Sequence, residues 1–153
     1  HGAYNMAMQL KPYGICVERL LLVECFSAPT ITSNVRHCFN LYEPRPNGDG
    51  LRVATVRHLP RGVRKSDWKF DSWLPILAPS AELLAEFKQG KLSDAKFFQR
   101  YRAEMKSPNP RHVIELLAAV AKKTPLAVGC HCEEASRCHR TVLEELIRKA
   151  ANA

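Results

Sequence analysis

The sequence lacks an apolar run that approaches the roughly 20 residues needed by a membrane-spanning helix. The apolar stretch 15–26 (ICVERLLLVECF) is interrupted by Glu18, Arg19 and Glu24. It also lies too far along the chain, and has the wrong flanks, for a secretory signal peptide. No internal repeat or low-complexity segment is found. We therefore expect one domain by length and no membrane partner.

The cysteines lack the even spacing of a small extracellular disulfide domain. Of the six, Cys16, Cys25 and Cys38 are scattered in apolar surroundings, whereas Cys130, Cys132 and Cys138 crowd one segment. A chain of this length buries roughly 70% of its unfolded surface, so it needs no disulfide staples. We therefore expect a cytoplasmic, reducing location and thiols that are free or metal-bound.

The composition is that of an ordinary globular protein, with 46% apolar and 25% charged residues. What stands out is the balance of charge: the formal net charge is +8 and the sequence pI is about 9.4. Such a chain could bind nucleic acid or another polyanion. Charge alone does not separate that partner from a solvated basic surface.

Hydrophobic periodicity predicts an α/β fold. The front third has strand-like segments and the rest is mainly helical, closing with a Rossmann-like strand–loop–helix unit. We expect a small mixed or parallel sheet flanked by helices. The expected strands are 35–42, 51–59 and 126–130, with 14–26 a strand or a short helix; the expected helices are 66–77, 81–89, a segment after Ser93, a segment capped by Asn109, and 137–150.

The segment 129–140 (GCHCEEASRCHR) is the most unusual part of the chain. If 126–130 is a strand, Cys130 lies at its carboxyl end, where α/β proteins gather their chemistry. Ser136 is a plausible N-cap, which would place Cys138 and His139 in the first helical turn. A helix N-terminus lowers a thiol pKa. One interpretation is therefore a thiol enzyme with Cys130 or Cys138 as nucleophile and His139 as proton carrier.

Other interpretations of this segment remain open. Its Cys and His residues could bind zinc or iron; the ligands would be Cys130, Cys132, Cys138 and His139. The spacing C-x-C-x5-C-H lacks the usual paired ligands, and neighbouring helical side chains diverge by roughly 100°, so a distant ligand such as His37 or Cys38 could contribute. Arg137 and Arg140 could instead hold an anion at the helix start. The cysteines could also be small buried hydrophobic residues. The phosphatase-type spacing, a Cys followed six positions later by Arg, is absent.

A second basic stretch, 56–71 (VRHLPRGVRKSDWKFD), follows the predicted strand 51–59. It places Arg57, His58 and Arg61 near a strand end, although a solvated basic loop would look the same. Its aromatic residues are better explained by packing than by stacking on single-stranded nucleic acid.

Four segments together resemble the domain of unknown function 488 (DUF488) family, which includes the YeaO-like proteins. They are LPRGVRKSDWKFDSWLPILAPSAELLAEF, FFQRYRAEM, PLAVGC and CHRTVLEELI, and the resemblance covers about residues 34–149. It implies a compact cytoplasmic α/β domain without an established activity. Where relatives commonly have Trp-Pro-Arg-Gly, this chain has Leu59-Pro60-Arg61-Gly62, and Val56 replaces an acidic residue. YeaO-like relatives lack the cysteines but keep a histidine at the position of His139.

We therefore expect residues 34–153 to form the DUF488-like domain, with 1–33 an extension that adds a strand or an oligomer contact. One pocket at the strand ends would bind a small anionic ligand. Its ligand-binding residues would be Arg57, His58, Arg61, Arg137 and Arg140. A thiol-dependent enzyme is the leading hypothesis; a non-enzymatic zinc or iron module and a nucleic-acid-associated protein are the alternatives, and homo-oligomerisation is left open.

Overall fold

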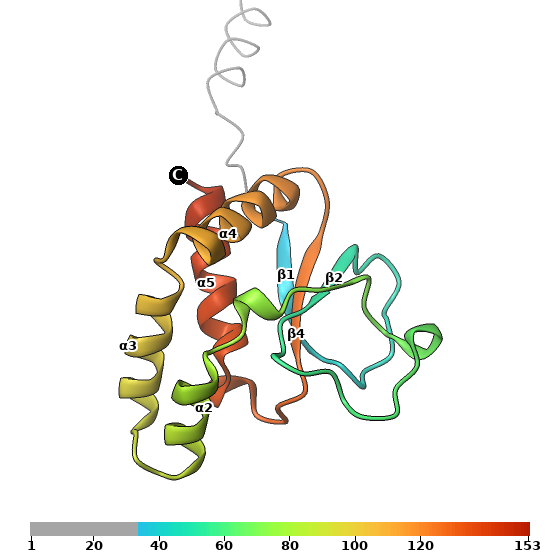
Figure 1. The fold of residues 1–153 in the computed structure, drawn as a ribbon. Helices are drawn as coiled ribbons and strands as arrows, with labels where there is room; N and C mark the ends of the chain where they lie inside the picture. Colours follow the sequence, from blue (N-terminus) through green and yellow to red (C-terminus); the bar gives the residue numbers. More distant parts are fainter. Residues whose placement is uncertain (1–33) are drawn as a thin grey trace, which may run out of the picture. The chain divides into compact units, whose positions relative to one another are not determined.

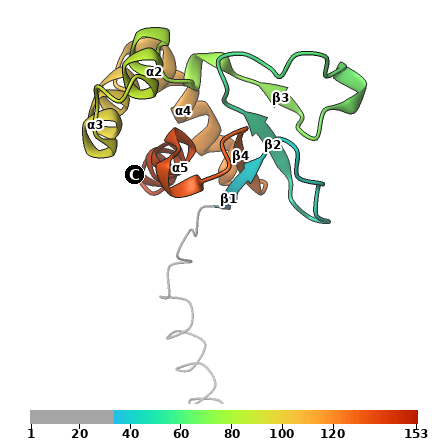
Figure 2. The same ribbon diagram turned by 90° about the horizontal axis from the view of Figure 1, so that it is seen from below.

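The computed structural model describes residues 34–153, and these contain a small parallel sheet (Figures 1 and 2). Its order is β1-β4-β2-β3, and every neighbouring pair runs parallel. The strands are β1 (Val35–Asn40), β2 (Leu51–Ala54), β3 (Ser72–Trp73) and β4 (Leu126–Cys130). The predicted α/β class is confirmed, with a sheet that is parallel throughout. The expected strand 14–26 and the N-terminal extension 1–33 lie outside the described residues.

Strand β4 is central because its sequence, LAVGC, has no charge and little bulk. All five of its residues are buried, as expected of a strand covered on both faces. Gly129 lies directly beneath the ring of Phe39 on β1, and a Cβ at position 129 would approach Phe39 Cζ to 2.3 Å. Only glycine fits at this point of the sheet without a shift of the ring.

Four helices lie on one side of the sheet (Figures 1 and 2). They are α2 (Ala81–Lys88), α3 (Asp94–Glu104), α4 (Pro108–Ala121) and α5 (His139–Ala151). The predicted N-caps Ser80 and Ser93 are confirmed, because their hydroxyls accept hydrogen bonds from the backbone N–H groups of Leu83 and Lys96. The predicted cap at Asn109 is wrong: Ser107 precedes the first helical residue, Pro108.

The helices and the sheet bury the main hydrophobic core. Strand residues Val53, Leu126 and Val128 pack against apolar side chains from α2 to α5. Tyr101 is fully buried there, and its hydroxyl donates to the carbonyl oxygen of Leu77 at 2.8 Å. None of the helices within 34–153 is both long and apolar enough to cross a membrane.

Irregular chain covers the opposite face of the sheet. We call segments 41–50 and 55–71 the loop layer. A second core lies beneath it, formed by Phe39, Leu41, Ala54, Val56, Phe70, Ala127, Cys130 and Cys138.

The predicted helix 66–77 is wrong: this part of the chain forms two short 3-10 turns, Lys65–Asp67 and Pro75–Leu77, separated by β3. Because β3 pairs with β2, tertiary contacts outweigh the local helical pattern there.

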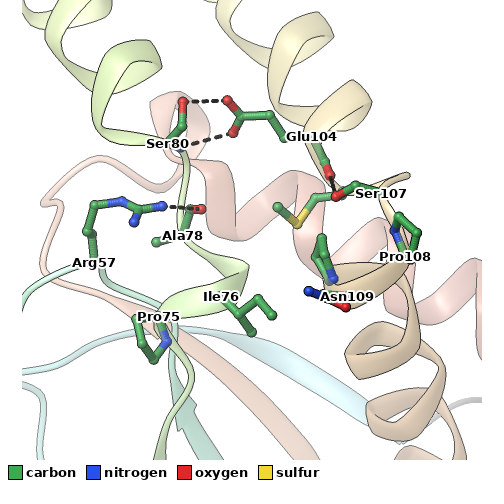
Figure 3. Close-up of a pocket in the computed structure, with 11 residues that line it drawn as sticks. Arg57, Pro75, Ile76, Ala78, Ser80, Glu104, Ser107, Pro108 and Asn109 are labelled. Carbon is green, nitrogen blue, oxygen red and sulfur yellow. Dashed lines mark hydrogen bonds between the residues drawn. The ribbon is translucent and has the colours of Figure 1, made fainter.

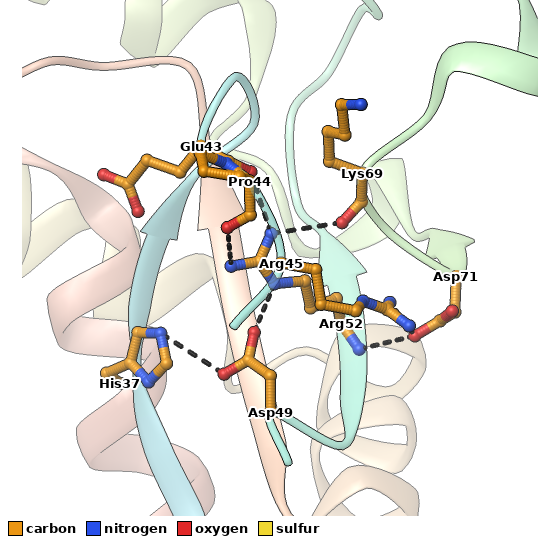
Figure 4. Close-up of polar contacts among 8 residues, drawn as sticks. All are labelled: His37, Glu43, Pro44, Arg45, Asp49, Arg52, Lys69 and Asp71. Atoms are coloured by element: carbon orange, nitrogen blue, oxygen red, sulfur yellow. Dashed lines mark hydrogen bonds and ion pairs between the residues drawn. The ribbon is translucent and has the colours of Figure 1, made fainter. Parts of the chain in front are cut away.

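Arg52 anchors the loop layer to the sheet (Figure 4). Its side chain is fully buried, it lies over the ring of Phe39 and it pairs with buried Asp49. Its guanidinium also donates to the carbonyl oxygens of Glu43, Lys69 and Pro44 at 3.1, 3.2 and 3.3 Å. One side chain from β2 therefore holds both parts of the loop layer.

Candidate functional site

The carboxyl ends of β1, β2 and β4 lie at one edge of the sheet because the strands are parallel. A cavity of about 320 Å³, which we call the thiol pocket, opens at this edge. Its walls come from the loop after β2, from the end of β4 and from the start of α5. The lining residues are Tyr42, Val56, Arg57, His58, Leu59, Pro60, Pro79, Leu84, Lys88, Cys130, His131, Cys132 and His139.

Three thiols converge beside this cavity. The Sγ atoms of Cys130, Cys132 and Cys138 all lie within 4.8 Å of one another, and those of Cys130 and Cys132 are 3.4 Å apart. All three are free thiols. Cys130 and Cys138 are only 2% and 1% exposed, whereas Cys132 is exposed to solvent. The cluster thus has two buried members and one that is open to reagents.

The start of α5 differs from the predicted helix start and explains this convergence. The helix begins at His139, and Cys138 precedes it with extended φ and ψ of −109° and 142°. The predicted cap Ser136 lies in a 3-10 turn and its hydroxyl bonds the Glu134 carboxylate instead. Because Cys138 is not helical, the expected 100° divergence between Cys138 and His139 does not apply.

The contacts of the His139 ring favour one of its two tautomers. Its Nε2 lies 2.9 Å from the carbonyl oxygen of Thr55, which can only accept, so Nε2 carries the hydrogen. Nδ1 is then unprotonated, and it lies 3.7 Å from Cys138 Sγ. Burial lowers the pKa of His139 to about 4, so the imidazole is neutral at pH 7.

The three thiols share their protons unequally. The pKa of Cys132 is lowered because its sulfur accepts hydrogen bonds from the Cys130 and Cys138 thiols. Donation to the Cys132 sulfur raises the pKa of Cys130 to about 11. Donation to both neighbours, together with burial, raises the pKa of Cys138. The first negative charge of the cluster therefore belongs on Cys132.

Arg140 is a buried cation in the first turn of α5. It is 3% exposed, and its guanidinium donates to the carbonyl oxygens of Phe39 and Cys130 at 2.8 and 3.3 Å. Within residues 34–153 it forms no ion pair, and its Nε has no hydrogen-bond partner. It does not line the thiol pocket.

Only two of the five predicted anion-binding residues line the pocket. They are Arg57 and His58. The Arg57 guanidinium also donates to the carbonyl oxygen of Pro79 and to that of Ala78, the second of which Figure 3 shows. Arg57 further borders a second, open hollow of about 730 Å³. Arg61 is exposed outside the thiol pocket, and Arg137 is paired with Asp94 at 2.9 Å.

The expected distant metal ligands lie apart from the thiol cluster. His37 Nε2 is 3.4 Å from Asp49, and the thiol of Cys38 donates to Glu144 at 3.0 Å. Sequence reasoning also missed three polar pocket residues, Tyr42, Lys88 and His131. His131 lies within the unusual segment 129–140, so the sequence could have identified it as a site residue. Tyr42 and Lys88 come from remote parts of the chain, and no local pattern marks them as site residues.

Comparison with known proteins places the chain in a family. Residues 36–151 match DUF488-N3a, described as the active DUF488-N3 subclade. The chain therefore belongs to the DUF488 family, as the resemblance predicted. It is 32% identical over 111 residues to the uncharacterized protein YeaO of Escherichia coli K12, a match that covers 72% of this chain and 95% of YeaO.

A second relative is the uncharacterized protein Rv3073c of Mycobacterium tuberculosis H37Rv. It is 29% identical over 107 residues, which cover 70% of this chain and 88% of that protein. No solved structure matches the chain significantly.

Proposed function

We propose that this protein binds one zinc ion through Cys130, Cys132 and Cys138, at the floor of a pocket for a small anionic ligand. The observation that carries the proposal is the convergence of three sulfur atoms within 4.8 Å. Thiolates bound to one zinc ion at about 2.3 Å, with tetrahedral angles, lie about 3.8 Å apart. The sulfur atoms therefore need only small shifts to hold the ion.

Arg140 supports a negatively charged cluster. A buried guanidinium without a counter-charge is costly, and no carboxylate pairs with Arg140 within the described chain. Its guanidinium donates to the carbonyl oxygen of Cys130. The side chain is buried and does not line the thiol pocket. Thiolates at the cluster would supply the missing negative charge.

His139 supports a coordination position that faces the thiol pocket. Its Nε2–H bond to the Thr55 carbonyl is the kind of contact that orients metal-binding imidazoles. Its Nδ1 lies beside Cys138 Sγ, although the ring is outside the group of three sulfurs. Three sulfur ligands leave a fourth position for His139 or for a bound ligand, as in zinc sites that keep one position open.

The walls of the thiol pocket support an anionic ligand. Arg57, His58, Lys88 and His131 line it, and no aspartate or glutamate does. Apart from the cysteine cluster itself, an anion in the pocket would therefore meet only neutral or basic side chains.

Metal analysis of the purified protein tests the proposal. We expect close to one zinc per chain after purification under reducing conditions, and loss of the metal in C130S, C132S and C138S. C38S is the matched control, because Cys38 is a partly buried cysteine outside the cluster, and it should keep the metal. Iron in place of zinc would change the metal assignment; wild-type protein that takes up neither metal on reconstitution would refute the proposal.

A thiol-dependent enzyme is the second candidate, and the exposure of Cys132 at the pocket favours it. The sequence-based nucleophiles Cys130 and Cys138 are almost fully buried, and Cys138 does not line the pocket. This candidate therefore assigns the reactive thiol to Cys132. We expect iodoacetamide to alkylate Cys132 first among the four cysteines of residues 34–153 in metal-free protein. Faster labelling of Cys38 than of Cys132 would remove this candidate.

A further inference from the structure

A second cavity adjoins the thiol pocket. It has a volume of about 190 Å³, and we call it the aromatic pocket. Its lining residues are Leu41, Tyr42, Leu59, Pro60, Val63, Asp67, Trp68, Lys69 and Phe70. Tyr42, Leu59 and Pro60 line both cavities, so one ligand could extend from the thiols into the aromatic pocket.

The aromatic pocket has features that suit a flat ring. Trp68 and Phe70 stack with their ring centroids 4.6 Å apart, and the side chain of Tyr42 is left 62% exposed at the boundary of the two cavities. The indole Nε1 of Trp68 is buried and has no acceptor among the described residues. The exposed ring of Tyr42 offers a stacking face to a flat ring in the pocket.

The loop around these cavities carries more positive charge than one small anion requires. From Arg57 to Lys69 it has five arginines and lysines against a single acidic residue, Asp67. Arg61, Arg64, Lys65 and Lys69 form no ion pair within residues 34–153. Lys69 lines the aromatic pocket, and Lys65 Nζ lies 5.9 Å from the centre of the Trp68 ring, so two of these cations lie close to the aromatic pocket.

We propose that the ligand is a nucleotide unit, with its base in the aromatic pocket and its phosphate beside Arg57 and Lys88, the arginine and lysine that line the thiol pocket. This inference rests on the proposed function, because it names the anion that the thiol pocket accepts. A free phosphate would leave the aromatic pocket unused, and a neutral aromatic compound would leave the cations unused. Bases stack on aromatic side chains while arginine and lysine bind phosphate. Free mononucleotides and single-stranded nucleic acid share this chemistry.

Tryptophan fluorescence gives a direct test. The chain has two tryptophans, Trp68 and Trp73, so the W73F variant reports on Trp68 alone. We expect adenosine monophosphate to quench this signal and to bind at least about tenfold more tightly than inorganic phosphate or adenosine, as one stacked base contributes. Equal affinity for adenosine monophosphate and phosphate would overturn the inference.

Variants separate the two halves of the ligand. Y42A should lower the affinity for the nucleotide but leave the affinity for phosphate unchanged. Because Tyr42 is exposed, we expect this variant to fold as the wild type does. K88A, at an exposed lysine that lines the thiol pocket, should weaken the binding of both and make nucleotide binding less dependent on salt. K122A, on the exposed end of α4, is the control and should change neither affinity. An unchanged nucleotide affinity in Y42A would contradict the assignment of the base.

Oligonucleotides identify the source of the nucleotide. Affinity that rises from mononucleotide to a short single-stranded oligomer, with steep salt dependence, assigns the unit to nucleic acid; equal affinity assigns it to the free nucleotide. Each titration is run on zinc-loaded and on metal-free protein. Nucleotide binding by protein that never takes up metal would refute the zinc proposal alone, and zinc binding without a preference for the nucleotide would refute this inference alone.

Discussion

At the scale of single residues, the contact between Gly129 and Phe39 is a tight constraint on the sheet. In G129A the new Cβ would lie 2.3 Å from Phe39 Cζ, and the ring is held above by the Arg52 guanidinium. We expect G129A to lower the free energy of unfolding by about 1–3 kcal/mol, the usual cost of overpacking a core. Urea denaturation measures this change. The double variant F39L/G129A should recover part of the loss; recovery of none would mean that the ring is not the cause.

Asp71 gives a prediction about pH. Burial alone would raise its pKa, but hydrogen bonds from the Arg45 guanidinium and the Arg52 backbone N–H outweigh burial, and the pKa is lowered. A lowered pKa stabilises the fold above the unfolded value, about 3.9, and the gain is lost as the pH falls through the folded value.

We therefore expect wild-type protein to exceed D71N in stability at pH 6 and the difference to shrink below about pH 4. Thermal unfolding of both proteins across this range measures the difference. In the R45A background the pH dependence should be smaller, since one of the two hydrogen bonds is gone. A difference that grows as the pH falls would contradict the assignment.

The sequence located the site residues unevenly, and the reason is physical. The cysteines and His139 crowd one short segment, so their meeting needed only a strand end beside a helix start. The burial of Arg140 depends on a carbonyl of Phe39, about a hundred positions away, which no local pattern encodes. Its predicted role in anion binding is therefore a proposal that its position outside the thiol pocket does not favour.

At the scale of secondary-structure elements, Arg52 holds the loop layer on a sheet face that a helix covers in other α/β folds. Removal of this guanidinium would leave buried Asp49 with only the imidazole of His37 beside it among the described residues, and three loop carbonyls without this donor. We expect R52M to lower the free energy of unfolding by about 3–5 kcal/mol and to make segments 41–50 and 55–71 sensitive to limited proteolysis. R45A removes an exposed pair and should cost no more than about 1 kcal/mol. Equal losses in R52M and R45A would contradict the anchoring role.

Periodicity predicted well the elements in which tertiary contacts favour the same secondary structure as the local sequence. The buried strand 126–130 and the capped helices after Ser80 and Ser93 are of this kind. Segment 66–77 is different, because Trp73 pairs with Ala54 and its indole N–H donates to the Val56 carbonyl. A two-residue strand fixed by such contacts has too little local signal to be predicted.

At the scale of the whole molecule, the proposed zinc site would join the last strand to the last helix. Cys130 ends β4 and Cys138 precedes α5, which packs against β1, β4 and α4. Because a metal that binds only the folded state stabilises it, we expect chelation to lower the Tm of wild-type protein. C132S should have a lower Tm than wild type and should not respond to the chelator, whereas C38S should respond as wild type does. A chelator effect of the same size in C132S would show that the metal lies elsewhere.

The crossover between β2 and β3 contains no α-helix, and this affects where the protein can be altered. The turn at Gly62, where φ is +81° and a Cβ would meet nothing within 4 Å, is solvent-exposed and lies between Pro60 and Val63, which line the aromatic pocket. Chain inserted there would extend over the openings while every helix kept its own partners. Grafting at this one turn should therefore change ligand preference without repacking the helices.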